Sequence, residues 1–268
     1  MNLDIYTTEM GKSVWDKAFF MDKIPGVKCI IDFGCADGTM IRYLAPLFPD
    51  IMFIGYDISK ELIDIARSIQ PFYANVTFFS GHTVGAENLI HFTQEKKFTS
   101  EEICLNFSSV LHEVFSSTGG IDTIQRLLDE LKPRYITIRD MYCDDTVELD
   151  AKDTRAYAPI LDKITTNELL LRYAIDFKEK FGFLKTWRDL THLMMKLQWT
   201  DNGWEDEMKE NYFSWRLEDV LKLTGNMYSP CFVCRYQLPY LSEKWRKEYN
   251  WYNPDIHTHA QFILRRDD

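Results

Sequence analysis

The segment Cys29–Gly38 has the sequence Cys-Ile-Ile-Asp-Phe-Gly-Cys-Ala-Asp-Gly, and it decides the fold. Its apolar start predicts a buried strand, its small residues predict a tight turn, and residues 39–44 predict a helix. Gly34 and Gly38 carry no Cβ, so the backbone there can adopt unusual φ and ψ values and approach a ligand closely. The segment therefore predicts half of a nucleotide pocket.

The helix after this turn and the next strand complete the predicted pocket. Because the helix begins near Thr39, its first N–H groups and the positive end of its dipole point at the turn, where they suit a carboxylate or phosphate. A second apolar strand, residues 51–57, ends at Asp57. A carboxylate at that strand end accepts hydrogen bonds from the two hydroxyls of a ribose. The spacing predicts an adenosine-containing ligand, and a turn that binds nothing is the alternative.

The order of small residues in the turn separates two classes of nucleotide ligand. A dinucleotide fingerprint needs G-x-G-x-x-G, whereas here the glycines are four residues apart and Asp32 precedes the first by two. The segment resembles motif I of the class I S-adenosylmethionine (SAM) methyltransferases, which has the pattern acidic-x-Gly-x-(Gly/Ala)-x-Gly. Asp57 matches the acidic ribose-binding motif II of the same family.

This resemblance implies an α/β fold, a Rossmann-like three-layer sandwich. Its seven-stranded sheet is mostly parallel, strand seven is antiparallel, and here a helical insertion separates strands five and six. The implied domains are a lid helix at 1–24, a SAM-binding core at 25–142, a helical cap at 143–214, and the end of the core at 215–268. The implied cofactor is SAM, with S-adenosylhomocysteine as its product.

The resemblance also implies which residues contact the cofactor. The residue after the acidic one packs on the adenine in such folds, and Ile58 has that place. The family commonly has an Asp just beyond strand three, but this chain has Ser80-Gly81-His82 instead, which leaves the backbone or His82 as substitutes. The expected cofactor-binding residues are Asp32, Gly34, Cys35, Ala36, Gly38, Asp57, Ile58, Gly81, His82, Phe107 and Ser108.

The catalytic candidates lie at the carboxyl ends of the fourth and fifth predicted strands, residues 103–109 and 135–141. Val110-Leu111-His112-Glu113 resembles the segment after strand four in many small-molecule methyltransferases, which implies that His112 faces the substrate. Polar groups at the carboxyl ends of strands are where α/β sheets place their chemistry. We expect His112 to act as a base and Glu113, Asp140 or Tyr142 to orient it. The alternative is a histidine bonded to backbone at a helix start.

A structural role is equally open for the end of strand five. There Arg139 and Asp140 could instead pair with a neighbour.

Composition limits the partners. The chain has 268 residues, 46% of them hydrophobic and 15% aromatic, which predicts a compact globule. A net charge of −10 gives no general attraction to polyanions, so it favours a small-molecule acceptor over nucleic acid. No apolar run approaches the length of a membrane span, and the N-terminus lacks a charged-then-apolar signal. We expect a cytoplasmic protein, a monomer or homodimer, without a membrane partner.

The six cysteines are scattered, mostly within predicted strands, which is typical of reduced thiols. Cys231-x-x-Cys234 could indicate zinc, with His257 and His259 further on. However, strand positions three apart face opposite sides, and no second cysteine pair exists. We expect no metal site.

The first residues and the insertion each have two interpretations. Tyr6, Met10 and Trp15 belong to an amphipathic spacing that predicts a helix, either a lid contacting SAM or substrate, or a helix packed on the sheet edge. In the insertion, Thr165-x-x-Glu168 predicts a capping box that opens a helix closed by Gly182. Its aromatic residues either enclose a substrate or form the core of a helical subdomain.

The last part of the chain predicts a helix at 217–223 and strands at 231–238 and 260–264. The segment 240–259 is interpreted as a long aromatic loop of unassigned role.

We therefore expect methyl transfer from SAM to an O or N atom of a small molecule. A methyltransferase acting on nucleic acid or protein is one alternative, although the (Asn/Asp)-Pro-Pro-(Tyr/Phe) signature is absent, since strand four has Asn106-Phe107-Ser108-Ser109. A SAM-binding protein without turnover is the other.

Overall fold

The computed structural model describes residues 13–117, 120–149, 154–200 and 203–268, and they divide into two compact units. Unit 1 contains the described part of residues 1–140 together with Leu217–Cys234 and Gln261–Asp268. Unit 2 contains Met141–Arg216 and Arg235–Ala260. The chain thus leaves unit 1 after Asp140, returns to it, and crosses to unit 2 once more before its last strand.

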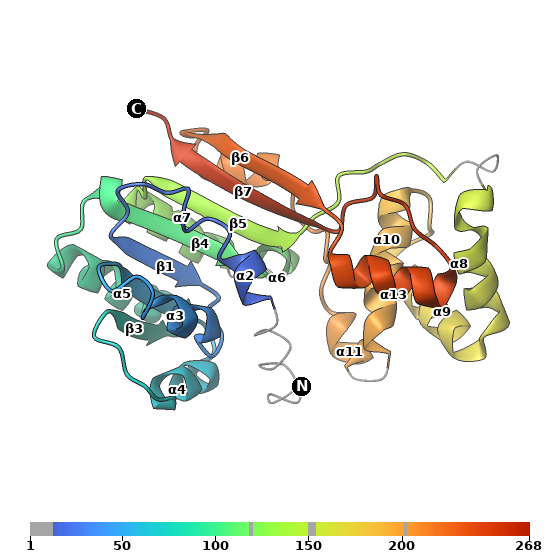
Figure 1. Cartoon of the computed structure of the whole chain (residues 1–268), viewed down its shortest axis with the longest axis horizontal. Coiled ribbons are helices and arrows are strands. Elements are labelled where there is room, and N and C mark those ends of the chain that lie inside the picture. The colour runs from blue at the N-terminus through green and yellow to red at the C-terminus, as the bar shows by residue number, and fades with distance from the viewer. Residues whose placement is uncertain (1–12, 118–119, 150–153, 201–202) are drawn as a thin grey trace. The chain divides into compact units, whose positions relative to one another are not determined.

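The elements alternate between strand and helix in unit 1 (Figure 1). The strands are β1 (Cys29–Phe33), β2 (Met52–Asp57), β3 (Val76–Ser80), β4 (Ile103–Ser108), β5 (Tyr135–Met141), β6 (Tyr228–Tyr236) and β7 (His259–Arg266). The helices of this unit are α2 (Val14–Lys17), α3 (Thr39–Leu44), α4 (Lys60–Ser68), α5 (Thr83–Glu95), η1 (Ser100–Glu102), α6 (Leu111–Ser116), α7 (Gly120–Leu131) and α12 (Leu217–Leu223).

The strands form one sheet in the order β3-β2-β1-β4-β5-β7-β6. The first five strands are parallel, and β7 runs antiparallel to its neighbours (Figure 1). In this register Asp32 lies opposite Gly55 on β2 and Asn106 on β4. Because parallel strands end at the same edge of a sheet, the turn after β1 and the ends of β2, β4 and β5 lie along one edge.

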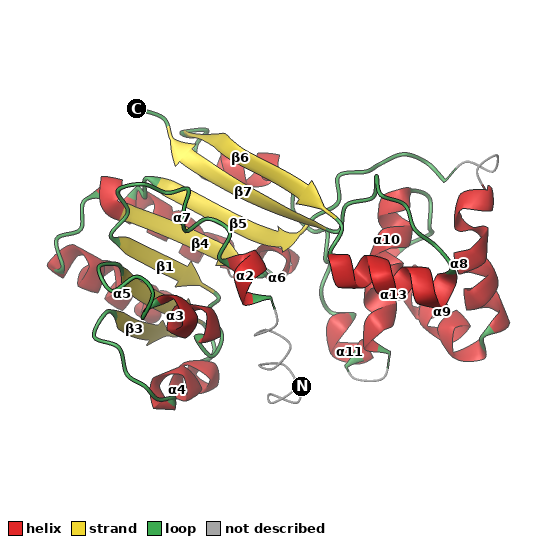
Figure 2. Ribbon diagram, in the orientation of Figure 1, coloured by secondary structure: helices red, strands yellow, loops and turns green. Residues whose placement is uncertain are grey.

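Helices cover both faces of this sheet (Figure 2). On one face α3 and α4 pack on β1, β2 and β4 through Met40, Ile41, Leu44, Ile63, Ala66, Ile30, Phe53 and Cys104. On the other, α5 and α7 lie behind the strands as drawn in Figure 1, with Leu89, Leu127 and Leu131 buried. The predicted α/β sandwich is confirmed, with the insertion α8–α11 between β5 and β6.

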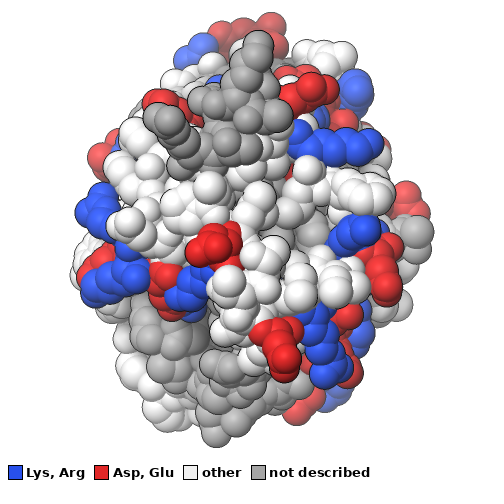
Figure 3. Space-filling model, turned by 90° about the vertical axis from the view of Figure 1, so that its right-hand side faces the viewer, with Lys and Arg blue, Asp and Glu red and all other residues white. Residues whose placement is uncertain are grey.

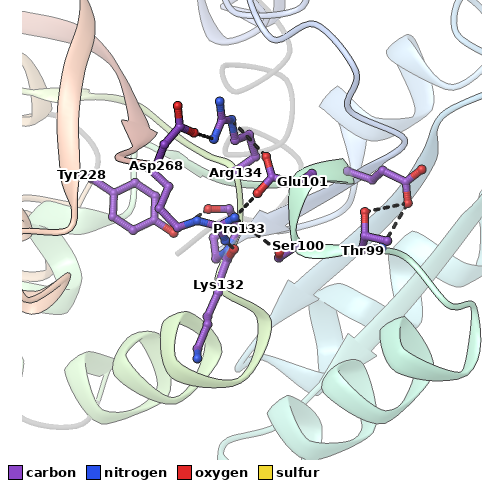
Figure 4. A network of polar contacts seen from close by, with 10 residues as sticks. Thr99, Ser100, Glu101, Lys132, Pro133, Arg134, Tyr228 and Asp268 are labelled. Atoms are coloured by element: carbon purple, nitrogen blue, oxygen red, sulfur yellow. Dashed lines mark hydrogen bonds and ion pairs between the residues drawn. The ribbon is translucent and has the colours of Figure 1, made fainter.

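The amino-terminal edge of the sheet is closed by ion pairs (Figure 4). Arg134, just before β5, pairs with Glu101 at 3.2 Å and with Asp268 at 2.9 Å. Arg266 of β7 also contacts Glu101, and the Tyr228 hydroxyl donates to the carbonyl of Pro133. These contacts fasten β6 and β7 to the sheet at the edge opposite the turn.

Unit 2 is helical around an aromatic core. Its elements are α8 (Thr154–Thr166), α9 (Glu168–Phe181), α10 (Trp187–Lys196), η3 (Leu197–Trp199), α11 (Trp204–Glu207) and α13 (Pro239–Tyr249). The rings of Trp187 and Trp251 stack with centroids 6.2 Å apart, and Trp245 lies 5.6 Å from Trp251. The face drawn in Figure 3 shows acidic and basic side chains interspersed, without a patch of one sign.

Several element boundaries differ from those predicted. Asn167, not Thr165, caps α9, because its Oδ1 accepts from the Leu170 N–H. The Thr165 hydroxyl donates instead to the carbonyl of Leu161 within α8. The predicted loop 240–259 contains α13, which buries Leu241, Trp245 and Tyr249.

The structure of the two ends of the chain also differs in part from the prediction. Of the predicted N-terminal helix, Tyr6 and Met10 lie outside the described residues, and α2 is the part that the structure describes. The predicted strand at 231–238 lies at Tyr228–Tyr236. All six cysteines are free.

Candidate functional site

The turn after β1 has the backbone that its small residues predict. Gly34 and Gly38 have φ values of 76° and 73°, and Ala36 between them has a φ of 49°. The N–H groups of Gly34 and Cys35 both donate to the carbonyl of Tyr56, at 2.8 and 3.0 Å. The turn is therefore fixed against the end of β2.

Neither glycine of the turn has room for a side chain. A Cβ on Gly34 would lie 2.5 Å from the side chain of Val110, and one on Gly38 would lie 2.6 Å from the ring of Phe78. The prediction of left-handed backbone is confirmed, and the close approach of a ligand to this turn stays a prediction. Cys35 is buried beside this turn as well.

The helix after the turn is also less open than predicted. The Thr39 N–H and hydroxyl both donate to Asp37 Oδ1, at 3.1 and 2.8 Å. The side chain of Asp37 thus satisfies one backbone N–H group in the first turn of α3, which is six residues long. The prediction that this helix start receives a ligand anion has no support from its hydrogen bonds.

Asp57 is held at the end of β2 by two backbone donors. Its Oδ2 accepts from the Ala36 N–H at 3.0 Å and its Oδ1 accepts from the Ser59 N–H at 2.8 Å. Burial raises the pKa of Asp57, and these two hydrogen bonds oppose the shift. The next residue, Ile58, is 58% exposed, and its contact with an adenine stays a prediction.

Three strands carry a chain of buried polar side chains, which we name the polar ladder: Asp32, Asn106, Thr137 and Cys104. Asn106 Nδ2 donates to Asp32 Oδ1 at 2.7 Å, and Thr137 Oγ1 donates to Asn106 Oδ1 at 2.7 Å. Cys104 Sγ lies 3.7 Å from Thr137 Oγ1. The sequence predicted Asp32 but not the other three, and polar residues within two apolar strands were the available signal.

The end of β4 places the two remaining predicted residues on opposite faces. Phe107 is buried with its ring centroid 5.5 Å from that of Phe33. Ser108 is 5% exposed, and among the described residues its Oγ has no hydrogen-bond partner. A buried hydroxyl without a partner is costly, which is the signature of a group that awaits a ligand or water.

The structure brings His112 and Asp140 together. His112 Nδ1 lies 2.7 Å from Asp140 Oδ1, and the His112 N–H donates to Asp140 Oδ2 at 3.1 Å. Both side chains are buried. An ionised Asp140 requires the proton on Nδ1, which leaves Nε2 as the basic nitrogen. Nε2 lies 4.0 Å from Glu113 Oε1.

Two cations lie beside this edge, and the sequence analysis missed the first of them, Lys17. Lys17 of α2 is 5% exposed, and burial, then the neighbouring Arg139, lower its pKa to about 8, while Asp32, Asp140 and Asp37 oppose the shift. The signal was a lysine on the apolar helical face of Val14 and Ala18.

Arg139 is the second of these cations. It pairs with Asp16 of α2, 2.5 Å from Nη2 to Oδ2, and donates from Nη1 to the Ser109 hydroxyl at 2.8 Å. Gln261 of β7 donates to the same Asp16 at 2.8 Å. The pairing of Arg139 with a neighbour is therefore confirmed, and it fastens α2 to β5 and β7.

The other predicted residues have varied surroundings. Gly81 has a φ of 102° and open space beside it, and its carbonyl accepts from the Tyr56 hydroxyl at 2.7 Å. His82 is exposed at the start of α5.

Tyr142 belongs to unit 2, where its ring lies 5.2 Å from that of Trp215. Trp15 is exposed with its ring 4.9 Å from Tyr43.

No protein-family model and no curated protein sequence matches this chain. Among solved structures, it is similar to a chain of the complex between the Haloferax volcanii Trm112 methyltransferase activator and its candidate methyltransferase. The identity is 10%, the alignment covers 99% of this chain and 96% of that one, and the TM-score is 0.51.

It is also similar to TnmH, at 11% identity over 98% of this chain and 57% of that one, with a TM-score of 0.52. A SAM-dependent methyltransferase from Mesorhizobium loti is 13% identical over 95% and 98% of the two chains, with a TM-score of 0.49. The likeness shows a shared fold, that of the class I methyltransferases. None of the described helices has the length and apolar character needed to cross a membrane.

Proposed function

We propose that this chain is a SAM-dependent methyltransferase that acts on an O or N atom of a small molecule. The observation that carries the proposal is the pair of carboxylates, Asp32 and Asp57, at the ends of neighbouring parallel strands beside a left-handed turn in this fold. Two acceptors there suit the ammonium and the ribose hydroxyls of one ligand.

The residues at this edge fit such a ligand. Asp57 has both oxygens oriented by backbone donors, so each keeps a lone pair for a ribose hydroxyl. Ile58 would receive the adenine, and Gly81 leaves open space at the end of β3. When bound, SAM supplies a methyl group on a sulfonium that an aligned nucleophile can take in one displacement.

His112 and Asp140 point to the kind of acceptor. A base is needed only where the nucleophile carries a proton at neutral pH, as a hydroxyl does. Asp140 fixes the tautomer of His112 through a 2.7 Å contact and stabilises the imidazolium that forms. In the proposed reaction His112 Nε2 takes the acceptor proton, and Asp140 holds the ring.

The helical insertion begins directly after Asp140, and we propose that it selects the acceptor, as a cap, while α2 belongs to the lid. The acidic composition and the mixed charges of Figure 3 favour a small acceptor over nucleic acid. A nucleic-acid or protein acceptor and a non-catalytic SAM-binding role are outcomes that the test below separates. Cytoplasmic location and oligomeric state stay predictions.

Calorimetry with SAM, S-adenosylhomocysteine and NAD in parallel tests the cofactor. We expect both adenosyl ligands to bind, NAD not to bind, and Asp57→Ala to weaken them about 30-fold or more, since bonds to a charged acceptor contribute roughly 2 kcal/mol. Asp50→Ala, which removes an exposed carboxylate, is the matched control.

Transfer of labelled methyl from SAM into fractionated extracts then identifies the acceptor class. Label in small molecules supports the proposal. Label in RNA, DNA or protein would show that the acceptor is a macromolecule instead of a small molecule. Tight binding of SAM without any labelled product would indicate a SAM-binding protein without turnover. Unchanged affinity of Asp57→Ala for the adenosyl ligands, or a preference of the wild type for NAD, would contradict the proposal that SAM is the cofactor.

A further inference from the structure

The polar ladder crosses the interior of the sheet, where apolar side chains would pack at less cost. Asn106 and Thr137 have no exposed surface, and Asp32 is 3% exposed. Buried polar networks are tolerated only when their members are satisfied, and apolar replacements of similar shape are often as stable. A role in binding would explain why three strands carry polar groups here.

The hydrogen bonds of the polar ladder have one direction. The single hydroxyl proton of Thr137 is committed to Asn106 Oδ1, so the Cys104 thiol must donate to Thr137. Burial raises the pKa of Cys104 to about 12, so this thiol keeps its proton. Every proton of the ladder therefore points toward Asp32, which is the arrangement that an ionised carboxylate requires.

The polar ladder ends at a carboxylate that has one oxygen without a donor among the described residues. Asp32 Oδ1 accepts from Asn106, and no described residue donates to Asp32 Oδ2. Ser108, two residues beyond Asn106 on the same strand face, carries the hydroxyl that also lacks a partner among the described residues. Two oxygens on one face thus remain for a donor with several protons.

We propose that Asn106 and Thr137 are positioning residues, which hold Asp32 ionised so that it accepts the α-ammonium group of an adenosyl amino-acid ligand, with Ser108 as a second acceptor. The inference rests on the proposed function and extends it to residues that touch no ligand. A proton on Oδ1 of Asp32 would turn the Asn106 amide over and reverse the polar ladder, and a proton on Oδ2 would occupy the oxygen that the ammonium needs. A cation bound at Oδ2 favours the ionised carboxylate, and therefore the direction of hydrogen bonds that the polar ladder has in the structure.

The charges around Asp32 set the pH range of this effect. Burial raises the pKa of Asp32 to about 7, the bond from Asn106 and the charge of Lys17 on α2 oppose the shift, and Asp57 on β2 adds to it. The buried thiols of Cys35 and Cys104 also face this carboxyl. Ligand affinity should therefore rise with pH through this range, because the ammonium needs the carboxylate.

The test compares S-adenosylhomocysteine with 5′-methylthioadenosine, which lacks the amino-acid portion, by calorimetry at about pH 6 and about pH 8. For the wild type, affinity for the first probe should rise with pH and that for the second should not. Thr137→Val removes the hydroxyl and keeps the shape. If this raises the pKa of Asp32 by about one, S-adenosylhomocysteine binds about tenfold more weakly at pH 6 and about twofold at pH 8.

Three further variants keep the test interpretable. Thr137→Ala lacks the hydroxyl but packs differently, so it should show the same pH signature, and Thr137→Ser should restore wild-type binding. Thr93→Val removes a buried hydroxyl bonded to a backbone carbonyl in α5 and should change neither probe. Thermal unfolding of each variant shows that it folds.

The outcomes separate this inference from the proposed function. Equal losses for both probes, or a loss independent of pH, would show a merely structural role and overturn the inference. A wild type that binds neither probe would overturn the proposed function and the inference with it.

Discussion

Each unit buries a histidine, in opposite kinds of surroundings. In unit 1 His112 contacts the carboxylate of Asp140 at 2.7 Å. In unit 2 His192 lies among rings, 4.7 Å from Phe181 and 5.4 Å from Phe213 between centroids, and its Nε2 accepts from the Tyr212 N–H at 3.4 Å. The first arrangement stabilises a protonated ring, and the second requires a neutral one.

Two buried lysines repeat the contrast. Burial lowers the pKa of both to about 8. Lys17 is surrounded by the carboxylates of Asp32, Asp37 and Asp140. Lys196 lies over the ring of Tyr212, 3.4 Å from its centroid, and donates to the carbonyl of Glu207, while the charges of Glu207 and Glu210 oppose the fall of its pKa.

The difference teaches that burial of an ionisable group does not by itself indicate function. Unit 1 gathers opposite charges along a strand edge where the buried Ser108 hydroxyl has no partner among the described residues, whereas in unit 2 aromatic rings pack against both the histidine and the lysine. The first pattern predicts effects on ligand and turnover, and the second predicts effects on stability.

The largest expected effect concerns the two histidines. His112→Asn keeps a donor for Asp140 but removes Nε2, so kcat with an identified acceptor should fall about 10² to 10⁴-fold while the free energy of unfolding changes little. His192→Phe should leave kcat within about twofold but lower the free energy of unfolding by about 1–3 kcal/mol, because the Tyr212 N–H loses its acceptor. Steady-state kinetics and urea unfolding measure both, and the reverse pattern would break the comparison.

Asp32→Asn should separate binding from stability. Below about pH 7 the folded protein without ligand keeps a proton on Asp32, whose pKa is about 7 against an ordinary value of 3.8, so wild-type stability falls as pH rises through this window. The amide does not titrate, so the variant should gain stability relative to wild type by up to about 1.4 kcal/mol per pH unit between about pH 4 and 7. Urea unfolding across this range measures the gain, and affinity for S-adenosylhomocysteine should drop. A stability difference independent of pH would show that Asp32 is ionised throughout.

The smallest expected effect contrasts the lysines. Lys17→Met removes the cation that opposes three carboxylates, so we expect a loss of about 1–3 kcal/mol in the free energy of unfolding at neutral pH. Lys196→Met removes a charge whose burial is unfavourable and keeps the volume, so the change should be within about 1 kcal/mol of zero or stabilising. Denaturation at matched pH gives both values. Equal losses in the two variants would mean that their surroundings are energetically alike.

The sheet and much of its site edge could be predicted from the sequence. The parallel strands are short apolar runs bounded by turns, and the polar residues at their ends fall on one edge by topology. His112 follows β4 and Asp140 lies at the end of the neighbouring β5, so their approach was predictable, although not its distance. Asn106 and Thr137 were not predictable as partners, because their pairing depends on the register of β4 with β5.

Unit 2 was predicted less well. Both Thr165 and Asn167 can cap a helix, and only the end of α8 at Thr166 decides between them. In α13 the buried Leu241, Trp245 and Tyr249 recur every four residues, but the aromatic and polar residues between them hid that period. Lys17 was missed because a charge on a short helical face normally lies in solvent.

The left-handed φ of 49° at Ala36 has a thermodynamic consequence for binding. An alanine in this conformation is less favourable than a glycine by about 1 kcal/mol, yet its side chain leaves the turn fewer alternative shapes. The chain entropy of this turn is therefore lost during folding, before any ligand arrives. Such preorganisation should appear as a smaller entropic penalty of association than in an Ala36→Gly variant.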